Sequence, residues 1–131
     1  ERNIESLFDM DVVFICVDSA IVRSFISRHL IDQGVYFVDS GLGLTLNSNS
    51  IGGQVRVTSF FGGDGEYIKD IFGSTEAPDD GIYTTNIQIA TLNSLAAILM
   101  IVSWLKHIGV FETSNEFRNL VFNVGMGKFL S

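Results

Sequence analysis

An unbroken apolar run at residues 12–17, Val-Val-Phe-Ile-Cys-Val, is the feature that most constrains the fold of this chain. A short run rich in β-branched residues and apolar on both faces is typical of a strand covered on both sides, and predicts a central strand of a parallel sheet. Asp18 and Ser19 follow with side chains that cap helices. Apolar residues at helical spacing then predict a helix that ends at Gly34; they are Ile21, Val22, Phe25, Ile26 and Leu30.

A second short strand is predicted at residues 35–38, Val-Tyr-Phe-Val. A helix between two such strands implies that the strands are parallel. The polar, glycine-containing segment at residues 39–43 predicts a turn at the carboxyl end of the sheet, where open α/β sheets bind ligands. We therefore expect Asp18 and Asp39 to face one crevice at the same edge of a mostly parallel sheet.

The rest of the chain adds further expected elements. Residues 47–50 predict a loop, and residues 53–58 alternate like a half-exposed strand. Residues 60–80 predict a long loop with one short helical candidate at 67–72, residues 86–107 a long apolar helix, and residues 119–124 a closing strand. The expected fold is a single α/β domain over residues 1–131, a Rossmann-like mixed sheet of parallel and antiparallel strands flanked by helices.

Composition excludes several classes of protein. With 47% apolar and 18% charged residues, the chain is too apolar to be disordered. Its net charge of −7 argues against a nucleic-acid partner. A single cysteine cannot pair within the chain, which favours a reducing, cytoplasmic setting. Residues 87–105 are long enough to span a bilayer, but the polar Gln88, Thr91 and Asn93 interrupt them, so we expect a buried or interface helix and no membrane partner.

The order of several segments resembles the ThiF/MoeB/HesA family, the bacterial relatives of ubiquitin-activating enzymes. The resemblance covers nearly the whole chain. Its segments are Cys16-Val17-Asp18-Ser19 with Arg23, Asp39-Ser40-Gly41-Leu42-Gly43, residues 53–57, residues 86–93, and a final strand at residues 120–130. The resemblance implies that the chain is the carboxyl-terminal part of a nucleotide-binding domain. Because the family opens with a strand and a GxGxxG turn, we expect the domain to be incomplete at its N-terminal side.

The resemblance also implies an activity. Family members bind ATP with Mg²⁺ and adenylate the terminal glycine carboxylate of a ubiquitin-like or sulfur-carrier protein, usually as homodimers. The aspartate matching Asp18 is the family's Mg-ATP residue, and carboxylate oxygens suit Mg²⁺. Ser19, where the family usually has asparagine, and Arg23 would complete the nucleotide contacts. The alternatives are that Asp18 and Ser19 only cap the helix, and that Arg23 either orients Asp18 or lies on a solvated helix face.

No zinc site is predicted. Neither His29 nor His107 has a second ligand at metal spacing. Cys16, placed in an apolar strand, is expected to be buried and inert rather than a thioester nucleophile.

Two other functions remain open. Residues 11–16 and 34–38 also resemble the nicotinamide domain of the Gfo/Idh/MocA oxidoreductases. That family places Glu-Lys-Pro after its second strand, whereas this chain has Asp39-Ser40-Gly41 and thus no lysine for proton transfer. The other possibility is a catalytically silent module for dimerisation or partner binding.

Overall fold

The computed structural model describes residues 3–73, 89–113 and 118–130. They form an open five-stranded sheet in the order β1-β2-β3-β4-β5. The strands are β1 (Val12–Ile15), β2 (Tyr36–Asn47), β3 (Ser50–Phe60), β4 (Asn119–Asn123) and β5 (Lys128–Leu130). β1 and β2 are parallel, and each later neighbour is antiparallel. The predicted α/β class with a mixed sheet is confirmed. The expectations of a mostly parallel sheet and of a central position for β1 are wrong for the described residues, because β1 lies at the edge.

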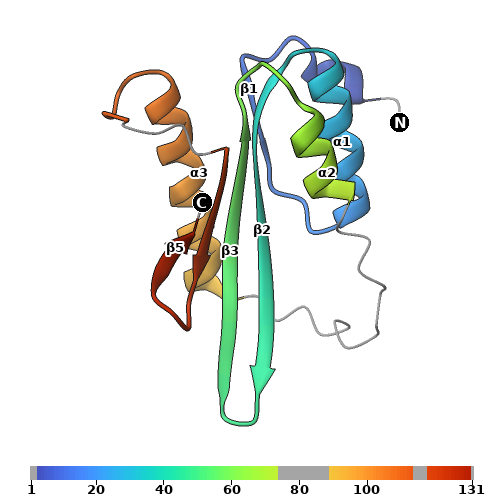
Figure 1. Ribbon diagram of the computed structural model, residues 1–131. Coiled ribbons are helices and arrows are strands. Elements are labelled where there is room, and N and C mark those ends of the chain that lie inside the picture. The colour runs from blue at the N-terminus through green and yellow to red at the C-terminus, as the bar shows by residue number, and fades with distance from the viewer. Residues whose placement is uncertain (1–2, 74–88, 114–117, 131) are drawn as a thin grey trace.

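Helices lie on both sides of the sheet (Figure 1). A short 3-10 helix, η1 (Ile4–Leu7), comes first in the chain. Helices α1 (Ala20–Asp32) and α2 (Glu66–Gly73) lie on one side of the sheet. Helix α3 (Ala90–His107) lies on the other side. The short helix predicted at 67–72 is confirmed as α2. Parts of two other predictions, residues 74–80 of the loop and 86–88 of the long helix, lie outside the described residues.

Residues 39–43 form part of β2, so the predicted turn is wrong. Asp39 pairs with Thr58 and Gly43 pairs with Gln54 in one continuous antiparallel ladder that ends at the hairpin between Asn47 and Ser50. Gly41 in this segment allows close packing of neighbouring side chains and does not form a turn. A Cβ at Gly41 would lie 3.1 Å from Nη1 of Arg23 and 3.3 Å from Nη2 of Arg56. A side chain at this position would therefore require both guanidinium groups to move by a few tenths of an ångström.

The final segment is a hairpin of two strands, not one strand over residues 120–130. Val121 and Asn123 of β4 pair with Leu130 and Lys128 of β5. Between them the chain reverses, and Gly127 adopts a positive φ of 59° that glycine accommodates without strain. The predicted strand at 119–124 is therefore confirmed as β4, and β5 is an additional strand.

The core has one cluster on each side of the sheet. On the α1 and α2 side, Leu30, Phe37 and Ile68 are almost completely buried. On the α3 side, Val38 and Val57 pack with Met100. Alternation along β2 sends Phe37 to one side and Val38 to the other.

The inward face of α1 differs from the expected apolar stripe. Arg23, Ser27 and Leu30 are its buried residues, whereas Ile21 is 83% exposed. Ile26 and Ile31 are partly buried and also pack against this core, so the apolar contacts of α1 come from its middle and end, while Ile21 and Val22 are exposed.

By length and composition, α3 is apolar enough to cross a membrane. Core helices of soluble proteins meet the same criterion. Here Met100 is buried against the sheet, while Ile98 and Ile101 on the same helix are exposed.

We expect Leu30→Ala to lower the free energy of unfolding by about 2–5 kcal/mol, because it removes a fully buried side chain and leaves a cavity. Ile21→Ala is the matched control on the same helix and should change stability by less than about 0.5 kcal/mol. Urea unfolding followed by circular dichroism measures both. Equal losses for the two variants would contradict the observed orientation of α1.

Candidate functional site

Asp18 and Ser19 lie in the connection from the carboxyl end of β1 to the first turn of α1. Both are exposed. The hydroxyl of Ser19 accepts a hydrogen bond of 3.3 Å from the backbone N–H of Val22, so Ser19 is the N-cap of α1. The capping interpretation is confirmed for Ser19. Asp18 lies between the last residue of β1 and the N-cap of α1, close to the positive end of the α1 dipole.

Arg23 occupies neither of the two positions expected for it. Its side chain is buried, and Nη1 donates a hydrogen bond of 3.2 Å to the carbonyl oxygen of Ser40. Its Nε lies 3.7 Å from Oδ1 of Asp39. Within the described residues no ion pair joins Arg23 to Asp18. The arginine therefore links α1 to β2.

Asp39 is held between two arginines. Nη2 of Arg56 lies 3.7 Å from its Oδ2, opposite the contact with Arg23. The guanidinium of Arg56 also lies over the ring of Phe72, 5.7 Å from the centroid, a distance at which a cation and an aromatic ring attract. We call Arg23, Asp39 and Arg56 the ion cluster. With Asp39 ionised, its net charge is one positive unit.

Burial dominates the electrostatics of this cluster. Desolvation raises the pKa of Asp39 to about 6, although both arginines favour its ionised form. Desolvation likewise lowers the pKa of Arg56. Within the part of the chain that the structure describes, neither carboxylate oxygen of Asp39 has a hydrogen-bond partner, and a separation of 3.7 Å is too long for one. The cluster is therefore a buried group of charges whose hydrogen bonds are incomplete, and such a group is costly to keep in a protein interior.

Asp18 and Asp39 do not face one crevice. Asp39 is completely buried beneath α1, whereas Asp18 is exposed. Asp39 pairs with Ile15, the last residue of β1, and β2 then continues past this level. The prediction failed because it assumed that both parallel strands end at the same edge.

The other candidates can also be located. Cys16 is exposed, not buried as expected, because pairing of β1 with β2 stops at Ile15 and leaves Cys16 outside the sheet. His107 is half-buried and stacks on Phe61, with ring centroids 4.1 Å apart. Among the described residues, no three histidine, cysteine, aspartate or glutamate side chains gather as metal ligands.

Sequence reasoning missed Arg56 and gave Asp39 the wrong surroundings. The sequence did contain a signal for Arg56. It stands between Val55 and Val57 in the strand, so its side chain must lie on the opposite face of the sheet from theirs. That face is covered by α1 and α2. A charged residue at such a position requires a charged partner.

No family model and no curated protein matches this sequence. The resemblance to the ThiF/MoeB/HesA family therefore stays a prediction that rests on the segments described above.

We expect the stability of the wild-type protein, measured against Asp39→Asn, to fall by about 2 kcal/mol between pH 4 and pH 7. The folded state holds the Asp39 proton up to a pKa of about 6, whereas the unfolded chain releases it near 3.8. A folded state that binds more protons loses stability as pH rises, and each pKa unit is worth about 1.4 kcal/mol. Urea unfolding at a series of pH values provides the measurement.

Asp11→Asn, at an exposed aspartate before β1, is the control and should not reproduce this pH dependence. A difference between wild type and Asp39→Asn that stays constant or grows with pH would show that the arginines outweigh the burial of Asp39.

Proposed function

We propose that this chain is part of an ATP-dependent adenylyltransferase that activates the terminal glycine carboxylate of a ubiquitin-like or sulfur-carrier protein. The observation that supports this function best is the exposed Asp18 carboxylate immediately beyond β1, in a parallel β1-α1-β2 unit. In α/β proteins this end of the strands is where ligands bind.

Asp18 fits the role of a magnesium ligand. It offers oxygen donors, it is exposed, and the loop that carries it leaves the sheet at the strand end. Mg²⁺ is usually held by one or two carboxylates together with substrate phosphates. The ion would neutralise phosphate charge as the bond between the α- and β-phosphates breaks.

The protein's own groups would act on charge and position. One carboxylate oxygen of the carrier glycine attacks the α-phosphorus of ATP, pyrophosphate leaves, and a mixed anhydride of carrier and AMP forms. The amino-terminal end of α1 favours negative charge near Asp18 and Ser19. Arg23 and Arg56 carry one more positive charge than Asp39 offsets, which favours anionic substrates at this end of the sheet.

A second function, that of a catalytically silent module for dimerisation or partner binding, is favoured by exposed apolar side chains on and after α3. Ile98, Ile101 and Phe111 are each at least 46% exposed. Such residues are common at protein interfaces. Homodimerisation is compatible with both functions.

Asp18→Asn should lower carrier-dependent ATP–pyrophosphate exchange at least about a hundredfold, because it removes a charged ligand from the reacting phosphates. The assay uses the full-length protein encoded by the source gene with a carrier protein that ends in glycine. Asp11→Asn removes an exposed aspartate before the amino end of β1 and should leave exchange unchanged.

Both variants should keep the wild-type urea midpoint, since both positions are exposed. Exchange that survives Asp18→Asn would remove Asp18 from the chemistry. If the wild-type protein shows no exchange and instead forms a stable complex through α3, the partner-binding function is the better account.

A further inference from the structure

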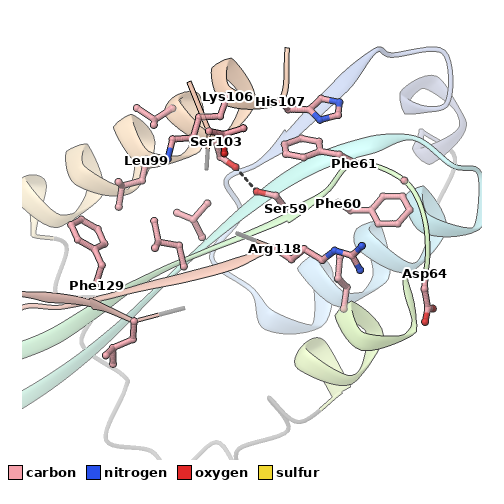
Figure 2. Close-up of a pocket in the computed structure, with 17 residues that line it drawn as sticks. Ser59, Phe60, Phe61, Asp64, Leu99, Ser103, Lys106, His107, Arg118 and Phe129 are labelled. Carbon is pink, nitrogen blue, oxygen red and sulfur yellow. Dashed lines mark hydrogen bonds between the residues drawn. The ribbon is translucent and has the colours of Figure 1, made fainter. Parts of the chain in front are cut away.

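A cavity of about 510 Å³ lies between α3 and the sheet. Its volume is in the range of small-molecule sites. Most of its walls come from α3, from β3 and the loop after it, and from β4 and β5 (Figure 2). Asp18, Ser19 and Arg23 are not among the lining residues, so the cavity is separate from the proposed adenylation site.

Part of the cavity wall belongs to the folded core. Leu99 of α3 and Phe61, which follows β3, both line the cavity. Both are partly buried and pack against the cluster of Val38, Val57 and Met100. Side chains that pack against a buried cluster keep their positions without a ligand, so this part of the wall is preformed.

Aromatic rings line the cavity at two places. Phe61 stacks on His107, with ring centroids 4.1 Å apart, and both line the cavity. Phe129 of β5 lines another part and is 53% exposed. Rings attract other rings through offset or edge contacts, and covering apolar surface contributes about 25 cal/mol for each Å² removed from water. The lining therefore suits an apolar body that contains a ring.

A pair of hydroxyl groups interrupts the apolar lining. Oγ of Ser59 and Oγ of Ser103 lie 2.6 Å apart, and either can be the donor. The pair joins β3 to α3, and Figure 2 shows it between Phe129 and Phe61. One hydroxyl donates to the other, and the accepting hydroxyl keeps its own hydrogen for a further acceptor. The pair can therefore donate one hydrogen bond to an oxygen in the cavity.

The position of Ser59 is fixed by the backbone. Its N–H donates a hydrogen bond of 2.8 Å to the carbonyl oxygen of Arg118, just before β4. The residue itself is 3% exposed. A buried donor held in this way fixes the orientation of a ligand more than it adds to the affinity.

The charged residues of the lining do not select one sign of charge. Asp64 and Arg118 have opposite charges, and Lys106 already has an interaction partner. Figure 2 shows Asp64 and Phe129 toward opposite ends of the cavity. An ionised group placed among the apolar residues near Phe129 would lose its hydration without gaining a partner, which is costly. The apolar part of the cavity therefore favours a neutral molecule.

We propose that this cavity binds a neutral small molecule with an apolar body that contains an aromatic ring and with one hydrogen-bond acceptor, such as a ketone oxygen. The body lies along Leu99 and Phe129, and the acceptor receives the remaining hydrogen of the Ser59–Ser103 pair. The proposal is independent of the adenylyltransferase function, since the two sites share no residue.

The test measures binding to the full-length protein by equilibrium dialysis at pH 7. The probes are butyrophenone, butylbenzene, 4-butylbenzoate and 4-butylbenzylammonium. The first two differ only in the carbonyl group, and the last two add a charge of either sign. Butyrophenone should bind saturably, butylbenzene about tenfold more weakly, and both charged probes at least about tenfold more weakly than butyrophenone.

A double variant tests the role of the hydroxyl pair. Ser59→Ala combined with Ser103→Ala should weaken butyrophenone about tenfold, which corresponds to about 1.4 kcal/mol, and should leave butylbenzene unchanged. Both hydroxyls are removed because either one alone could donate to the ligand. Ser24→Ala combined with Ser27→Ala is the matched control, since it also removes one half-buried and one buried serine, on the other side of the sheet.

A second pair of variants locates the apolar body and stays informative if the double serine variant fails to fold. Phe129→Ala should weaken butyrophenone and butylbenzene alike, by about fivefold. Phe111→Ala, at a phenylalanine that is 47% exposed and does not line the cavity, should change neither.

Four results would overturn the proposal. They are no saturable binding of butyrophenone, equal binding of butyrophenone and butylbenzene, tighter binding of a charged probe than of butyrophenone, and equal effects of a cavity variant and its matched control.

Discussion

The ion cluster of Arg23, Asp39 and Arg56 joins most of the elements on one side of the sheet. Asp39 belongs to β2, Arg23 to α1 and Arg56 to β3, while Arg56 also lies over Phe72 of α2. A buried charge that loses its partner is strongly destabilising, by about 3–5 kcal/mol. Both arginines therefore depend on Asp39, and Asp39 depends on both of them. Gly41 is part of the same arrangement, because its lack of a side chain leaves space for both arginines.

This cluster also fixes what α1 presents to solvent. With Arg23, Ser27 and Leu30 turned toward the sheet, helical geometry places Ile21 on the outside. The N-cap at Ser19 then leaves Asp18 just outside the helix, exposed at the strand end. The proposed magnesium ligand is thus exposed in the connection between β1 and α1, outside both elements.

The α3 side of the sheet is organised by apolar and aromatic contacts instead of charge. Met100 packs against Val38 and Val57. Nearer the end of α3, His107 is stacked on Phe61 and lies beside Trp104. A cavity lies next to this aromatic group, and Phe129 and Leu130 of β5 form part of its wall. The two sides of the sheet therefore differ in chemistry.

Local patterns predicted those features that depend on a few neighbouring residues. The strand predicted at residues 12–17, the helix after Ser19 and the long apolar helix at residues 86–107 were indicated by spacing and composition, and correspond to β1, α1 and α3. The antiparallel path of residues 39–43 was not. Its glycines are equally compatible with a turn and with a strand that packs closely against other side chains, and only the partner strand distinguishes the two.

The sequence by itself determined that this chain forms a β-α-β unit followed by a further strand and a long apolar helix, because backbone preference and hydrophobic period act over short segments. The tertiary structure decided that Arg23 turns inward, that Asp39 is buried and that Asp18 and Cys16 are exposed. Those outcomes depend on where pairing of β1 stops and on Arg56, which lies far along the chain from both Arg23 and Asp39. No local pattern carries that information, since the energy of a buried charge is set by partners that only folding brings near it.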